Sequence, residues 1–193
     1  MAKASSARED MLAAAVELFR ARGYAGVGVA ELLEKSGAPR GSLYFHFPGG
    51  KEQIGAEAVT RVGEEVAARF RELRLSGVDL ATFIERVFKT TAHEVKERKY
   101  KASCPMAAIA AEFSNDNPKL QTAVRDAFAS WEREIALAAR GEGMSEPNAA
   151  AFASAMLTAI EGAFVVSKAQ ESSAPHVNAS RAMQALAAAL RAN

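Results

Sequence analysis

The sequence predicts an all-α protein of about nine helices, and three observations support this fold class. Apolar residues recur with helical spacing, as Leu12, Ala15, Val16 and Phe19 do at i, i+3, i+4 and i+7. The alternation of apolar and polar residues that marks β-strands does not appear in the sequence. Glycine, proline and serine or asparagine divide the chain into segments of helical length.

Three short helices are expected first. Gly23 ends a helix over 5–22, and Gly37 can adopt the left-handed conformation that ends a helix over 29–36. Pro39 lacks an N–H and has a fixed φ, so it suits the first position of a third helix over 39–46. The next break, Pro48-Gly49-Gly50, precedes a long helix over 51–75.

Five further helices are bounded in the same way and are expected over 79–99, 104–114, 118–140, 147–171 and 177–191. Their breaks are Ser76-Gly77, Cys104-Pro105, Asn117-Pro118, Gly141 to Pro147 and Ser172 to His176. The later helices are longer and richer in alanine than the first three. We therefore expect a small domain over 1–52 and a larger helical domain over 53–193.

Composition excludes several classes of protein. The net charge of +1 is uninformative about nucleic acid, and residues 1–53 hold seven Lys or Arg against six Asp or Glu. One cysteine and three dispersed histidines predict neither a disulfide framework nor a metal site, and no cofactor is expected. Without a signal peptide or a long uncharged apolar run, the chain is expected to be cytoplasmic, with no membrane partner.

The third helix has two contrasting faces. Turning it by 100° per residue places Leu43 and Phe47 on one side and Gly41, Ser42 and Phe45 on the other. If Leu43 and Phe47 anchor the helix to the core, the aromatic side chain of Phe45 is left facing water. The major groove of DNA could cover it. Base or backbone contacts are then expected from Arg40, Ser42, Tyr44, Phe45 and His46.

The start of the fourth helix is a second candidate contact with DNA. The positive charge of Lys51 opposes the helix macrodipole there, and a bound phosphate would make it favourable. Gly28, at the start of the second helix, is expected to let a phosphate approach in the same way. On spacing alone the alternatives stay open, because Tyr44 and Phe45 could pack in a core and Gly37 could join two ordinary helices.

The segments AAVELFRARGY and VAELLEKSGAPRGSLYFHFPGGKEQI closely resemble the DNA-binding region of the tetracycline-repressor (TetR) family. GAPRGSLYFHFPGGKEQ, SCPMAAIAAE and AIEGAF are similar to its branch that contains the lincomycin-resistance repressor. The resemblance implies a ligand-responsive repressor that binds double-stranded operator DNA. By this resemblance the DNA-contacting positions are Arg40, Gly41, Ser42, Tyr44, Phe45, His46 and Lys51. At Gly28 many members have a Ser or Thr cap, so that side-chain phosphate contact is lost here.

The resemblance also implies a homodimer through the last two helices. Two apolar stripes are compatible with a dimer, although each could equally be internal core. One consists of Phe152, Ala155, Met156, Ala159 and Ala163, and the other of Ala182, Leu186, Ala189 and Leu190. A small, apolar or aromatic effector is expected among the middle helices. The candidate lining residues are Phe83, Val87, Thr91, Met106, Ile109, Phe113, Phe128, Trp131, Ile135, Ile160, Glu161 and Phe164, with His93 and Cys104 as further polar candidates.

Catalysis has little support in the sequence. Gly26-Val27-Gly28 and Gly141-Glu142-Gly143 lack the third glycine of a dinucleotide site, and His93-Glu94 lacks a second histidine for zinc. Cys104 suits an inert buried residue better than a redox sensor. The chain is therefore not expected to be an enzyme. The competing interpretation is a ligand-independent helical protein that binds DNA or another macromolecule.

Overall fold

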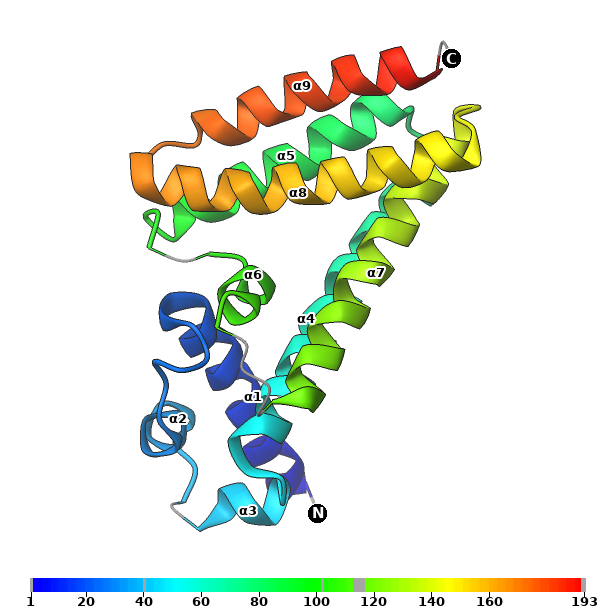
Figure 1. Cartoon of the computed structure of the whole chain (residues 1–193). Coiled ribbons are helices and arrows are strands. Elements are labelled where there is room, and N and C mark those ends of the chain that lie inside the picture. Colours follow the sequence, from blue (N-terminus) through cyan, green and yellow to red (C-terminus); the bar gives the residue numbers. More distant parts are fainter. Residues whose placement is uncertain (1, 40, 102, 113–116, 192–193) are drawn as a thin grey trace. The chain divides into compact units, whose positions relative to one another are not determined.

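A computed structural model describes residues 2–39, 41–101, 103–112 and 117–191. In those residues the regular secondary structure consists of nine α-helices, which confirms the predicted fold class (Figure 1). The helices are α1 (Ala2–Arg22), α2 (Val29–Ser36), α3 (Ser42–His46), α4 (Gly50–Leu75), α5 (Leu80–Glu97), α6 (Pro105–Ala110), α7 (Pro118–Gly141), α8 (Glu146–Gln170) and α9 (Ala174–Arg191).

Four predicted helix bounds are wrong by three or more residues. Helices α1 and α9 each begin three residues before the expected start, at Ala2 and Ala174. Helix α3 begins at Ser42 rather than Pro39, because the N–H and the hydroxyl of Ser42 both donate to the Pro39 carbonyl, at 2.9 and 2.7 Å. That turn leaves Pro39 before the helix. Helix α6 ends at Ala110, where a longer segment was expected. It does begin as predicted, with Pro105 directly after a buried Cys104.

The described residues form two compact units. The first comprises residues 1–63 and 104–127, and therefore contains α1, α2, α3, α6 and the beginnings of α4 and α7. Its core holds large apolar side chains from α1, α2, α3 and α4, namely Met11, Phe19, Leu32, Leu43, Phe47 and Ile54. Residues 104–127 pack with the N-terminal helices, a grouping that the linear sequence does not indicate.

The second unit comprises residues 64–103 and 128–193. In it, α8 and α9 run antiparallel side by side and both pack against α5 (Figure 1). On α8 the side chains of Phe152, Met156 and Ala163 are buried inside this unit, whereas Ala155 and Ala159 are half-buried. Most of the α8 stripe is thus internal core, so the outward face of α8 is a different set of residues.

Helix α8 is long and apolar enough, by length and composition alone, to cross a membrane. Nearly half of its most apolar window is buried inside the protein. The core helix of a soluble protein has the same composition, since its apolar side chains face other helices. Phe152, Ile160 and Phe164 occupy such buried positions, so the composition of α8 is explained by packing.

Candidate nucleic-acid interface

Helices α2 and α3 are joined by a turn that Gly37 makes. Gly37 has φ +68°, and its N–H donates to the Glu34 carbonyl at 3.2 Å. The N–H of Ala38 donates to the Leu33 carbonyl at 3.1 Å, so carbonyls at the end of α2 find donors. The predicted left-handed end of α2 at Gly37 is therefore confirmed, and α3 follows within a few residues.

Helix α3 has one buried and one exposed face, as its sequence predicts. Leu43 and Phe47 are fully buried, whereas the exposed fractions of Tyr44 and Phe45 are 64% and 77%. The Phe45 ring meets the half-buried His46 ring edge-on, with centroids 5.0 Å apart. The structure thus presents two aromatic side chains together on one short helix, held in place by the buried pair.

Small residues at the starts of α2 and α3 leave room for the sugar-phosphate backbone of DNA. Ser42 is half-buried, and its hydroxyl proton is used by Pro39, which leaves its oxygen free to accept. Gly41 is the N-cap of α3 and Gly28 the N-cap of α2, with no side-chain cap at either. Among the described residues, a Cβ at Gly28 or at Gly41 would meet no atom within 4 Å. Arg40 lies outside the described residues.

The start of α4 differs from the phosphate site that the sequence predicts there, because two backbone N–H groups have partners inside the protein. The N–H of Gly49 donates to Oε1 of Gln53 at 2.8 Å, and the N–H of Gly50 donates to the Phe47 carbonyl at 2.8 Å. These two donors are satisfied inside the protein rather than held open for a phosphate. A Cβ on Gly50 would lie 3.4 Å from the Tyr44 ring, so Tyr44 leans against the first residue of α4.

Lys51 is not extended into solvent. Its ammonium lies 4.2 Å from the centre of the Tyr24 ring, a cation–π contact in which the lysine is half-buried. Burial lowers the pKa of Lys51, and the negative charge of Glu112 acts in the opposite direction. Burial also raises the pKa of Tyr24, with a further contribution from Glu52. Lys51 is therefore a positive charge in a site formed by residues of this unit.

Sequence reasoning missed three residues around this site: Arg8, Tyr24 and Glu112. The Arg8 guanidinium lies 5.0 Å from the centre of the Phe47 ring and forms an ion pair with Glu57. None of the three has a local signal in the sequence, because tertiary packing alone brings Arg8, Tyr24 and Glu112 to the site.

The predicted effector-lining residues fall in both compact units. Met106 and Ile109 are buried in the first unit. Six of them are buried in the second unit: Phe83, Val87, Trp131, Ile135, Ile160 and Phe164. Three more are half-buried there: Thr91, Phe128 and Glu161. Phe113 lies outside the described residues. The aromatic rings of Phe70, Phe83, Phe128 and Trp131 form a chain of edge contacts with centroid separations of 5.5 to 6.4 Å.

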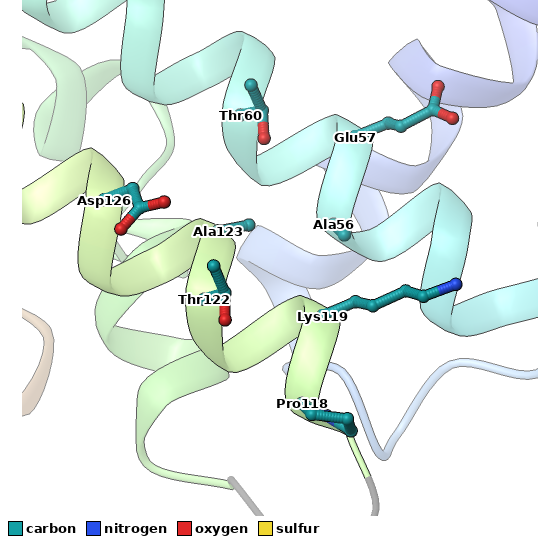
Figure 2. A pocket seen from close by; sticks show the side chains of 8 residues that line it. All are labelled: Ala56, Glu57, Thr60, Pro118, Lys119, Thr122, Ala123 and Asp126. Carbon is teal, nitrogen blue, oxygen red and sulfur yellow. The ribbon is translucent and has the colours of Figure 1, made fainter.

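The first unit also has an open groove of about 450 Å³ between the beginnings of α4 and α7. Figure 2 shows side chains of both helices around it, with Glu57 and Thr60 on α4 and Lys119 and Asp126 on α7. None of the predicted effector residues that the structure describes lines this groove. Its two carboxylates have partners: Glu57 pairs with Arg8 and Asp126 with Arg125. Among the described residues no cluster of metal-ligating side chains is present.

The fold and this site define a helix-turn-helix DNA-binding regulator with an attached helical domain. Residues 11–58 match the family model described as bacterial regulatory proteins, tetR family. Residues 81–182 match the model for the C-terminal domain of LmrA/YxaF-like transcriptional regulators. The chain belongs to the TetR family of transcriptional regulators.

Similar proteins agree with this assignment over most of the chain. The chain is 33% identical to the HTH-type transcriptional regulator LmrA of Bacillus subtilis, over 87% of this chain and 89% of LmrA. It is 30% identical to B. subtilis YxaF, over 91% of this chain and 92% of YxaF. The fold matches reduced Escherichia coli NemR with a TM-score of 0.82 at 24% identity, covering 92% of this chain and 94% of that one.

Proposed function

We propose that this protein is a ligand-responsive transcriptional repressor that binds a (pseudo)palindromic operator as a homodimer. The observation that carries the proposal is the exposed face of α3. Tyr44 and Phe45 are held in water there by the burial of Leu43 and Phe47, and a major groove is a surface that would cover them. Membership of the TetR family independently supports DNA binding by this part of the chain.

Each side chain at this face has a distinct expected role. Phe45 suits contact with a thymine methyl, and Arg40 a base edge or a phosphate. Tyr44, His46 and the Ser42 oxygen suit the DNA backbone or adjacent bases. Lys51 is expected to bind a phosphate through its ammonium, with the neighbouring backbone contributing less because Gly49 and Gly50 already donate internally. Gly28 and Gly41 suit close approach of the DNA backbone, since the space that a side chain would occupy at either position is open.

The outward faces of α8 and α9 support the proposed dimer. Both are made largely of small uncharged residues that allow helices to approach closely. On α8 the exposed stripe is Ala151, Ser154, Thr158, Gly162, Val165 and Ala169, and on α9 it is Ala174, Asn178, Ala182, Ala185 and Ala189. Both stripes follow the spacing of one helix face, so two copies could form a four-helix bundle.

The effector is proposed to be small and apolar or aromatic, because the candidate residues of the helical domain are mostly apolar and aromatic. Its binding would favour a conformation in which the spacing of the two DNA-binding domains of the dimer no longer matches the operator half-sites. We assign DNA reading to residues 1–52 and sensing and dimerisation to residues 53–193, in the cytoplasm. Screening by thermal shift against metabolites and drug-like molecules should find at least one ligand that raises the Tm. A screen without any such ligand would favour a ligand-independent DNA-binding protein.

The DNA-binding experiment measures fluorescence anisotropy of duplexes from the promoter region beside the protein's own gene. We expect sequence-preferring binding whose affinity falls as salt rises. Lys51→Ala should weaken binding to all duplexes and flatten the salt dependence, whereas Arg40→Ala should also relax the preference at one base pair. No sequence-preferring binding at low salt would contradict the proposed function.

The dimer is tested by Thr158→Arg, with Thr90→Arg as a matched control. Both threonines are exposed on helices and donate their hydroxyl to the carbonyl four residues earlier, at 2.9 Å in each case. Only Thr158 lies on the proposed interface, where a buried unpaired arginine would be costly. Sedimentation should therefore show monomers for Thr158→Arg and dimers for Thr90→Arg. Equal dimerisation of both variants would exclude this face.

A further inference from the structure

Glu112 lies directly after α6 and contacts the turn between α1 and α2. Its Oε2 atom accepts a hydrogen bond from the N–H of Ala25 at 2.6 Å. The carboxylate also fills the space beside Gly23, where a Cβ would lie only 1.9 Å from Oε1. Gly23 has φ +72°, and its lack of a side chain leaves room for this carboxylate. Glu112 is thus an anion fixed in a specific place by two contacts with the turn.

The same turn carries Tyr24, on whose ring the Lys51 ammonium rests. The Glu112 charge therefore lies close enough to Lys51 to stabilise its protonated form against the effect of burial. In the free protein the negative charge of Glu112 thus partly compensates the positive charge at the start of α4.

We propose that Glu112 acts as an electrostatic brake on DNA binding, because its nearby negative charge offsets the positive charge that Lys51 presents to a DNA phosphate. The brake rests on the proposed function of Lys51 as a phosphate ligand. A phosphate that approaches Lys51 meets a charge already partly compensated, and it is also repelled by Glu112 itself. Because Glu112 follows α6 directly, the position of α6 on α1 determines where this anion sits.

Replacement by glutamine separates charge from structure. Glu112→Gln keeps an oxygen that can accept the N–H of Ala25, and it removes the negative charge. Because Glu112 is exposed to solvent, we expect a moderate gain in affinity for DNA, roughly three- to tenfold at low salt. The gain should shrink as salt is added, since added ions screen the interaction between Glu112 and the phosphate.

Asp126→Asn is the matched control. Asp126 is an exposed carboxylate of the same compact unit, and its nearest ionic partner is Arg125. The two substitutions change the net charge of the protein equally, so any difference between them reports the location of the charge. A third variant, Lys51→Met, removes the ammonium and keeps much of the apolar side chain that contacts Tyr24.

The experiment measures Kd by fluorescence anisotropy for the full-length protein on a promoter duplex and on an unrelated duplex of equal length. We expect Glu112→Gln to bind both more tightly, Asp126→Asn to match the original protein within about twofold, and Glu112→Gln to give no gain in the Lys51→Met background. Equal affinities of Glu112→Gln and Asp126→Asn, or an undiminished gain without Lys51, would overturn the brake while leaving DNA binding intact. Absence of DNA binding by the unsubstituted protein would overturn the proposed function as well.

A second readout does not require DNA. In the free protein, Glu112→Gln should lower the pKa of Lys51 further, because burial would then act without the opposing charge. An NMR titration of the lysine side-chain carbons measures this pKa. An unchanged value would show that Glu112 does not act on Lys51, whatever happens to DNA affinity.

Discussion

The Oγ atom of Ser167 on α8 lies 2.9 Å from Nδ1 of His176 on α9, and this hydrogen bond is buried. His176 is fully enclosed, with the Phe164 ring perpendicular to its own at 5.1 Å between centroids. Its Nε2 atom is also buried and has no hydrogen-bond partner within the part of the chain that the structure describes. Burial lowers the pKa of His176 from 6.5 to about 4, while the charge of Glu94 acts in the opposite direction.

His176 should make the protein less stable in mild acid. Below pH 6.5 the unfolded chain binds a proton that the folded chain does not take up until about pH 4, so the free energy of unfolding falls as pH drops through this window. The loss should reach roughly 2–3 kcal/mol at fixed protein concentration. His176→Asn, which can still bond to Ser167, should flatten this slope in urea titrations between pH 7 and 4. The same substitution at the exposed His93 is the control, and an equal slope in both variants would contradict the prediction.

Glu134 on α7 should contribute strongly to stability. Its buried carboxylate accepts from Nε of Arg71 at 3.0 Å and from Nη2 of Arg74 at 2.9 Å, both on α4. Glu134→Ala leaves two arginines without this partner and should lower the free energy of unfolding by about 2–3 kcal/mol, less than a fully buried pair because Arg71 is half exposed. Asp126→Ala on the same helix breaks an exposed ion pair and should cost under about 1 kcal/mol. Urea denaturation measures both, and equal losses would argue against the buried site.

Gly63 sets the close approach of α4 and α7 in the first compact unit. A Cβ at Gly63 would lie 2.7 Å from the Cβ of Ala127 and 3.3 Å from its Cα, and neither atom can rotate away. Gly63→Ala should therefore destabilise the protein by about 1–2 kcal/mol in spite of the better helix propensity of alanine. A second substitution, Ala127→Gly, should recover part of this loss. Gly141→Ala, where nothing lies within 4 Å, should be neutral or slightly stabilising, and a similar effect of both single variants on the Tm would contradict the prediction.

Phe45 should matter for DNA binding and not for folding. Its exposed fraction of 77% means that Phe45→Ala removes little buried area, so the free energy of unfolding should change by less than about 0.5 kcal/mol. Loss of its contact with the DNA should weaken operator binding about tenfold in the anisotropy assay. Leu75→Ala removes a similarly exposed apolar side chain (69%) from the end of α4 and should change neither quantity. An unchanged operator affinity of Phe45→Ala would remove Phe45 from the interface.

The sequence by itself determined those features that depend on neighbouring residues. Helical periodicity predicted the all-α class and the two faces of α3, because residues three and four apart share one side of a helix. The left-handed end of α2 was predictable because glycine adopts that conformation without strain. Even so, local hydrogen bonding changed one bound, since Ser42 bonds back to Pro39 and delays the start of α3.

Tertiary structure alone decided which apolar stripe faces inward and which distant charges meet. Periodicity finds a stripe on α8, yet it cannot say that Phe152 and Met156 face the core while Thr158 and Val165 face solvent, because this depends on where α5 and α9 pack. Glu112 and Ala25 are 87 positions apart, so no local pattern connects them. Their hydrogen bond exists because packing of α6 on α1 brings the two segments together, and that packing also places a carboxylate near Lys51.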